Sequence, residues 1–139
     1  MRIPVAPRHD KGFYEARPGD VAGRDDLPLI DVRDERELTD RYGFGHIHGV
    51  GHRPMERILA EGLPGHPKDA PVVLVCDNGF RSRRCAARLA EAGFAEVYHL
   101  VGGMKRWTAE GRPVARVPTW RPAPGEPPVR RRAEGGGSS

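Results

Sequence analysis

The sequence has few cysteines and no long apolar run. Two cysteines among 139 residues cannot build the framework of several disulfide bonds that stabilises small secreted domains. No apolar stretch approaches the ~20 residues of a membrane span, and the N-terminus lacks the apolar segment of a signal peptide. We therefore expect a cytoplasmic protein that does not bind membranes.

Hydrophobic residues are also scarce, at 37 % of the chain, and the shortage is concentrated at its two ends. Gly and Pro crowd residues 1–26 and 118–139, whereas 27–117 has the composition of a globular core. We expect one domain over 27–117, because cores of roughly 100 to 150 residues are the commonest kind. Residues 1–26 are predicted to be an N-terminal extension that is partly ordered at most, and 118–139 a flexible tail.

Charge of one sign is not strongly in excess either. The formal net charge of +4 is too small to indicate binding to nucleic acid. The run Arg130-Arg131-Arg132 lies in the Pro/Gly/Arg-rich tail without interleaved aromatic residues, which is typical of a solvated segment. We expect no nucleic acid among the partners.

Apolar strand patterns alternate with helical patterns. Leu29–Val32 and Val72–Val75 are rich in branched side chains and predict strands buried on both faces. Glu96–Val101 and a short piece near Val50 predict two more strands. Helices are predicted directly after Cys76 and at Glu35–Tyr42, Met55–Glu61 and Met104–Glu110. The alternation predicts an α/β fold, an open, mainly parallel sheet flanked by helices on both faces.

The helix after Cys76 has the most distinct sequence signals. Ser82 is the predicted N-cap. Gly93 is predicted to end the helix in a Schellman motif, with Phe94 packing back on Leu89. The buried stripe consists of residues at helical spacing, namely Cys85, Ala86, Leu89 and Ala90.

Cys76 itself ends a buried strand and precedes a Gly-containing turn and this helix. Backbone N–H groups converge at such a position and the helix dipole is positive there, which favours a thiolate. Arg81, Arg83 and Arg84 add positive charge. Ligands of parallel sheets bind at the carboxyl ends of strands, so Cys76 is a predicted nucleophile. The alternative is a small buried residue that merely ends a strand.

Four segments resemble the rhodanese homology domain. CDNGFRS (76–82) is similar to the family's active loop, Cys-x-x-Gly-x-Arg-Ser. LIDVRDERE (29–37) resembles its Asp-Val-Arg segment, and GHIHGVGHRP (45–54) its Gly-His-Ile-Pro-Gly-Ala segment. LVGGMKRWTAEGRPV (100–114) resembles its Gly-Gly-x-x-x-Trp ending. The resemblance covers about residues 27–115, with the motifs in the family's order.

This resemblance implies a thiosulfate or persulfide sulfurtransferase in which Cys76 carries sulfur as a persulfide. Arg81 would orient or neutralise the donor, which is a small anionic sulfur compound or a protein persulfide. A thiol or cyanide is the implied acceptor, and no cofactor is expected. Backbone N–H donors stabilise the anionic terminal sulfur. The loop residues implied to cradle it are Asp77, Asn78, Gly79, Phe80 and Ser82.

Other residues near the motifs are expected to be structural. Asp31 and Arg33 follow a buried strand and should form a charge network that supports the loop. Trp107 is expected to pack in the core rather than wall the pocket. Cys85 is expected in the core as well, although a disulfide with Cys76 in a thiol-redox enzyme is the alternative.

Three histidines, His46, His48 and His52, match no strong zinc spacing, so no metal site is expected. A structural hydrogen-bonding role is predicted for His46. His48 stands where the family usually has Pro.

Rival activities use related loops. Protein phosphatases and arsenate reductases place five residues between Cys and Arg, whereas this chain has four, which suits a single sulfur atom better than a tetrahedral oxyanion. A non-catalytic rhodanese-type binding module is the main alternative, but such modules often lose the cysteine. A sulfur carrier that serves a partner protein stays open.

Two departures from the family pattern bear on the substrate. About four residues are inserted before Gly45, and Asp77 directly follows the nucleophile. Turned inward, Asp77 would oppose ionisation of Cys76 and the approach of thiosulfate. Turned outward, it would pair with Arg81 or Arg83 and organise the loop. We expect the inward orientation.

Overall fold

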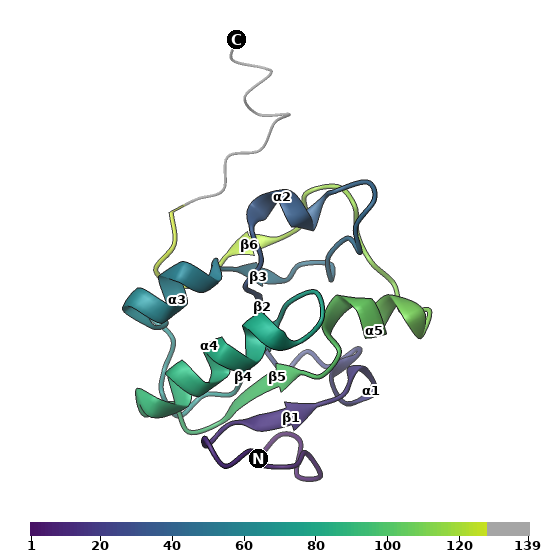
Figure 1. Cartoon of the computed structure of the whole chain (residues 1–139). Helices are drawn as coiled ribbons and strands as arrows, with labels where there is room; N and C mark the ends of the chain where they lie inside the picture. Colours follow the sequence, from purple (N-terminus) through teal and green to yellow (C-terminus); the bar gives the residue numbers. More distant parts are fainter. Residues whose placement is uncertain (128–139) are drawn as a thin grey trace.

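Six strands form one sheet in the order β1-β5-β4-β2-β3-β6 in the computed structural model, which describes residues 1–127 (Figure 1). All pairings between these strands are parallel. The predicted open α/β sheet is therefore confirmed. The strands are β1 (Tyr14–Ala16), β2 (Leu29–Asp31), β3 (Gly51–His52), β4 (Val72–Val75), β5 (Val97–Leu100) and β6 (Arg121–Pro122).

The central strand β4 shows why the sheet is covered on both faces. All four of its residues are fully buried, because successive side chains point to opposite sides. Val72 and Leu74 join a core cluster with residues of α3 and α4. Val73 and Val75 join a second cluster with residues of α1 and α5. The helices are α1 (Pro18–Val21), α2 (Glu35–Leu38), α3 (Met55–Glu61), α4 (Phe80–Glu91) and α5 (Gly103–Ala109).

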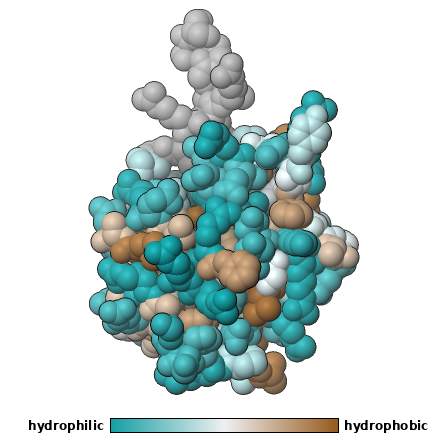
Figure 2. All heavy atoms as spheres, viewed as in Figure 1, coloured by the Kyte–Doolittle hydropathy of each residue, from teal (hydrophilic) through white to brown (hydrophobic). Residues whose placement is uncertain are grey.

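The outer faces of these helices are polar. Figure 2 shows mainly hydrophilic residues on the side that carries α3 and α4, with apolar residues in small patches. Both helices are thus amphipathic, and burial of their apolar stripes drives their packing on the sheet. None of the helices in residues 1–127 has the length and apolar character needed to cross a membrane.

The two ends of α4 can be compared with the predicted N-cap and the predicted Schellman motif. Phe94 N–H donates to the Leu89 carbonyl and Gly93 N–H to the Ala90 carbonyl, both at 3.1 Å, which confirms the Schellman motif. The predicted N-cap is wrong. Gly79, at φ 99°, is the N-cap, and Ser82 lies in the first turn, where its hydroxyl donates to the Gly79 carbonyl.

The folded part is wider than the predicted 27–117. In the expected N-terminal extension, β1 pairs with β5. In the expected tail, β6 pairs with β3, and Trp120 is buried. Both end segments have few apolar residues, but each supplies one of the two edge strands of the sheet. The remaining tail, 128–139, with its arginine run, lies outside the described residues.

Candidate active site

Cys76 lies at the carboxyl end of β4, where the chain turns into α4. The turn is made by Gly79 in the left-handed region, at φ 99°. A side chain there would be strained, and its Cβ would lie 3.3 Å from the Gly102 nitrogen. Glycine at this position thus lets the loop fold tightly around the cysteine.

The sulfur of Cys76 is held by the loop that follows it. The backbone N–H groups of Gly79 and Ser82 donate to Sγ at 3.0 and 3.3 Å. The thiol lies 3.4 Å from Ser82 Oγ and donates to it. Cys76 has no exposed surface. Two N–H donors at the start of a 12-residue helix favour negative charge on this sulfur.

Two of the five predicted loop residues, Gly79 and Ser82, therefore supply the N–H groups. The N–H of Asn78 is instead taken by the Asp77 carboxylate at 2.8 Å, and that of Phe80 by the Asn78 side chain at 3.2 Å. These two bonds shape the turn and do not reach the sulfur.

The N-terminus of α5 supports the loop that follows Cys76 through backbone hydrogen bonds. Met104 N–H donates to the Cys76 carbonyl at 2.9 Å, and Lys105 N–H to the Asp77 carbonyl at 2.8 Å. This approach needs Gly103, where a Cβ would lie 2.7 Å from the Asp77 carbonyl. The Gly-Gly motif thus supports the active loop, a role that the sequence alone did not reveal.

Arg81 is engaged within the protein. Its guanidinium forms two hydrogen bonds of 2.8 Å with the Glu37 carboxylate and an ion pair of 3.1 Å with Asp77. The bonds to Glu37 raise the pKa of Arg81 and lower that of Glu37. With two carboxylates beside it, Arg81 is a brace for the loop more than a free positive charge.

Glu37 was not predicted as a site residue. It belongs to a capping box of α2, in which it accepts the Asp34 N–H at 2.9 Å. The spacing Asp34-x-x-Glu37 is a recognisable signal for such a box. It would have placed Glu37 at the start of a helix, but not beside Arg81.

The Asp77 carboxylate faces Arg81 rather than the sulfur. The carboxylate accepts the Asn78 N–H and pairs with Arg81, and the side chain is 35 % exposed. This is the outward alternative, and the expected inward orientation is not observed. The cause is the neighbouring guanidinium, which stabilises the carboxylate where it lies.

Asp31 and Arg33 form a buried ion pair of 2.8 Å near the same edge of the sheet. The same guanidinium nitrogen, Nη2, donates both to the Asp31 carboxylate and to the Gly45 carbonyl, the latter at 2.7 Å. Asp31 pairs in register with Val75, next to the nucleophile. The pair therefore fixes the segment around Gly45, and within residues 1–127 the hydrogen bonds of its side chains do not reach the active loop.

Cys85 lies on the buried face of α4 and belongs to the core cluster there. Burial raises the pKa of Cys85 to about 12, so this thiol is not ionised near neutral pH. His46 and His52 bond to the Leu38 and Arg33 carbonyls, each at 2.7 Å. These contacts agree with the structural role expected for His46.

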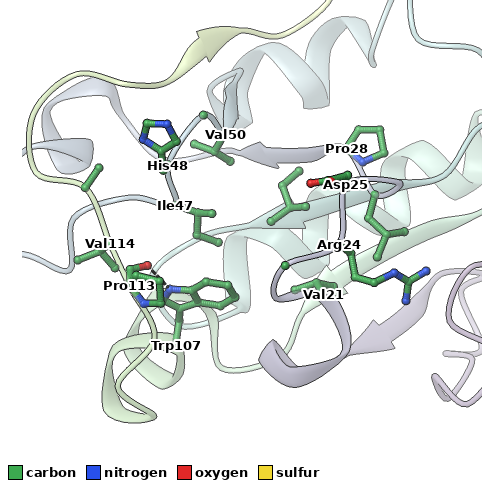
Figure 3. A pocket seen from close by; sticks show the side chains of 15 residues that line it. Val21, Arg24, Asp25, Pro28, Ile47, His48, Val50, Trp107, Pro113 and Val114 are labelled. Atoms are coloured by element: carbon green, nitrogen blue, oxygen red, sulfur yellow. Dashed lines mark hydrogen bonds between the residues drawn. The ribbon is translucent and has the colours of Figure 1, made fainter.

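Trp107 both packs in the core and lines a pocket. It is 4 % exposed, and its indole N–H donates to the Pro113 carbonyl at 2.9 Å. The pocket has a volume of about 480 Å³. Trp107 lies beside Ile47 on one side of it, and Val21 and Arg24 lie on the other side (Figure 3). Cys76 does not line this pocket, so Trp107 does not wall the cysteine site.

Comparisons with known proteins identify the family of this chain. The family model of the rhodanese-like domain matches residues 19–110. The chain is 38 % identical over 84 residues to the thiosulfate sulfurtransferase GlpE of Coxiella burnetii, an alignment covering 60 % of this chain and 74 % of that protein. A solved structure of a rhodanese-related protein from Thermoplasma volcanium superposes with a TM-score of 0.63 at 25 % identity, over 73 % of this chain and 97 % of that one.

A further relative is much longer. The probable adenylyltransferase/sulfurtransferase MoeZ of Mycobacterium tuberculosis is 39 % identical over 88 residues, which are 63 % of this chain. The match spans about a fifth of that protein, 21 % of its length. The family model covers most of the present chain, and the cysteine loop lies within the matched range. This chain is therefore a member of the rhodanese-like domain family.

Proposed function

We propose that the protein is a sulfurtransferase that carries a sulfane sulfur on Cys76. The Cys76 thiolate attacks the outer sulfur of thiosulfate, a new S–S bond forms, and sulfite leaves with the electron pair of the broken bond. A thiol or cyanide then attacks the terminal sulfur of the persulfide, which returns the Cys76 thiolate. A persulfide donor reacts in the same way, with a thiolate as the leaving group.

The observation that carries this proposal is the pair of N–H groups, from Gly79 and Ser82, aimed at the sulfur of Cys76. A persulfide has an anionic terminal sulfur, and fixed N–H dipoles stabilise that charge without supplying a proton. The relative named thiosulfate sulfurtransferase supports the same chemistry. A dithiol redox role has less support, because Cys85 is held in the core as a thiol.

The donor meets a positive rim formed by α4. Arg83 and Arg84 are exposed in the first turns of the helix, whereas Arg81 is already paired. Because Cys76 has no exposed surface, the donor reaches the sulfur only when the rim of the loop moves. Phe80, the first residue of α4, is 66 % exposed.

A protein acceptor is a second candidate, which would make the chain a sulfur carrier. Phe80 lies exposed beside the nucleophile, with the Arg83 guanidinium 5.7 Å from its ring centre. An exposed aromatic residue next to a cation is typical of a surface that contacts another protein. A non-catalytic binding module fits less well, since the loop that holds the sulfur is complete.

Transfer from thiosulfate to cyanide, followed as thiocyanate formation, tests the proposal. We expect turnover by the wild type and none by Cys76→Ser, with normal folding of both. Repeating the assay with dithiothreitol in place of cyanide, followed as release of hydrogen sulfide, tests a thiol acceptor. Turnover by Cys76→Ser, or none by the wild type with either acceptor and with a persulfide donor, would contradict the proposal.

A further inference from the structure

His99 lies in β5 beside the active loop and takes part in none of the steps above. The residue is 4 % exposed, and Phe13 packs edge-on against its ring with the ring centres 5.6 Å apart. Nδ1 lies 3.2 Å from Ser82 Oγ, which lies 3.4 Å from Cys76 Sγ. A buried chain of three polar groups thus joins the nucleophile to His99.

The surroundings of His99 keep its ring neutral. Burial lowers the pKa of His99 to about 4, and the charges of Arg83 and His9 act in the same direction. Glu15 on β1 opposes this effect, with Oε2 3.8 Å from Nε2. That separation is too long for a hydrogen bond. The imidazole therefore carries a single ring hydrogen near neutral pH.

The hydrogen-bond partners assign that hydrogen to Nδ1. Within residues 1–127, Nε2 has no hydrogen-bond partner, so a hydrogen there would be a buried and unsatisfied donor. On Nδ1 the hydrogen is donated to Ser82 Oγ. The hydroxyl of Ser82 then keeps its own hydrogen for an acceptor, which is the Gly79 carbonyl at 3.2 Å while Cys76 is a thiol.

We propose that His99 is a positioning residue whose Nδ1–H holds the Ser82 oxygen, so that the Ser82 hydroxyl turns its hydrogen to Cys76 when that sulfur becomes anionic. In the thiol form, Ser82 Oγ accepts from both Cys76 and His99. Ionisation of Cys76 removes the S–H, and rotation of the hydroxyl replaces it with an O–H donor to the sulfur. Hydrogen bonds in such a chain strengthen one another.

The inference rests on the proposed function, because Ser82 donates to Cys76 only when the cysteine is a thiolate or a persulfide. It identifies Ser82 as a third donor to the sulfur, besides the two backbone N–H groups. It also explains why a histidine with an unsatisfied Nε2 is kept in the core.

Two substitutions separate a donor role of His99 from a packing role. His99→Leu removes the donor, whereas His99→Asn keeps a side-chain N–H near the place of Nδ1. Thiolate absorbance is titrated against pH for each variant, and the same protein with Cys76→Ser is subtracted. We expect His99→Leu to raise the titration midpoint by about one pH unit and His99→Asn to restore most of the wild-type value.

Sulfur uptake from thiosulfate gives a second readout. Below the midpoint, uptake by His99→Leu should be about tenfold slower, because a one-unit shift lowers the thiolate fraction tenfold. His9→Asn is the matched control, since His9 stacks on Phe13 near His99 but does not bond to Ser82. Its midpoint and uptake should match the wild type.

Ser82→Ala removes one hydroxyl and keeps the proposal testable if His99→Leu fails to fold, as judged by circular dichroism. It too should raise the midpoint. An unchanged midpoint in folded His99→Leu or in Ser82→Ala overturns the proposal, as do equal shifts in His99→Leu and His99→Asn. Absence of sulfur uptake by the wild type would contradict the proposed function, while the titration would still decide the role of His99.

Discussion

The two cysteines are both fully buried, yet their surroundings differ in hydrogen-bond donors. Burial alone disfavours an anionic sulfur, as the high pKa of Cys85 shows. Cys76 is equally buried but accepts N–H groups from Gly79 and Ser82. The donors, and not exposure, therefore distinguish the proposed nucleophile from the core thiol.

Asp77, the residue after the nucleophile, pairs with Arg81 and so belongs with Arg81 and Glu37 to the loop brace, the ion-paired group that holds the active loop. Asp77 pairs with Arg81 and accepts the Asn78 N–H, so its removal should loosen the turn. We predict that Asp77→Asn leaves thiosulfate turnover unchanged or lowers it up to about tenfold, at low and at moderate salt. Steady-state rates at two salt concentrations check this. A clear rise in rate at low salt would show that Asp77 repels the donor.

The pairing of Glu37 with Arg81 should appear in acid stability. A carboxyl group with a lowered pKa stabilises the fold above its unfolded pKa and loses that contribution as the pH falls through its folded pKa. We predict that Glu37→Gln lowers the free energy of unfolding by about 1 kcal/mol at neutral pH, a figure reduced for the partial exposure of both partners. Below about pH 4 the two proteins should converge.

Urea denaturation at neutral and at acid pH measures this difference. Glu35→Gln is the matched control, because it removes the same charge from the first turn of α2 without contacting Arg81. An equal loss in both variants would attribute the effect to the helix and not to the loop brace.

At the scale of elements, local patterns predicted the strands and helices that build the site. Branched residues in 72–75 identified β4, and the Gly93 stop of α4 was correct because a Schellman motif depends on adjacent residues. The start of α4 was missed, since Ser82 contacts Cys76 instead of capping. Glu37 and His99 were missed for a related reason: their partners lie far away in the sequence, and only the sheet brings them together.

The contact between α5 and the active loop depends on glycine. Gly103 and Gly111 both have positive φ, of 55° and 74°, so alanine at either costs about 1 kcal/mol in backbone strain. Only Gly103 also has neighbours in the way, and Gly111 has no atom within 4 Å of a Cβ. We predict that Gly103→Ala loses roughly 1 to 3 kcal/mol more than Gly111→Ala.

Thermal denaturation compares the two variants, and the cyanide assay follows activity. Gly103→Ala should also lower turnover strongly, because the clash falls on the carbonyl groups of Cys76 and Asp77. Gly111→Ala should keep near-normal turnover. Similar stability and turnover in both variants would show that α5 does not support the loop.

At the scale of the whole molecule, residues 1–26 and 118–127 each contribute a strand to the sheet. The sequence suggested otherwise because composition averages over a segment, whereas a sheet edge needs only a few buried residues. Trp120 is 3 % exposed, and Glu126 forms an ion pair with the fully buried Arg53. Neither contact leaves a periodic signal in a segment rich in Pro and Gly.

A chain that ends at Val117 should accordingly be unstable. It loses the burial of Trp120, which costs roughly 3 kcal/mol or more, and it removes Glu126, one of the two carboxylates that pair with the buried Arg53. A chain that ends at Pro127 keeps every residue that the structure describes and serves as the control. Melting temperatures compare them, and equal values would show that β6 adds nothing to stability.

The central claim, that Cys76 carries the sulfur, is tested most directly by intact mass after incubation with thiosulfate. We predict that the wild type and Cys85→Ala each gain the mass of one sulfur atom, that cyanide or dithiothreitol removes it, and that Cys76→Ser gains nothing. A gain in Cys76→Ser, or equal loss of uptake in Cys76→Ser and Cys85→Ala, would contradict the account.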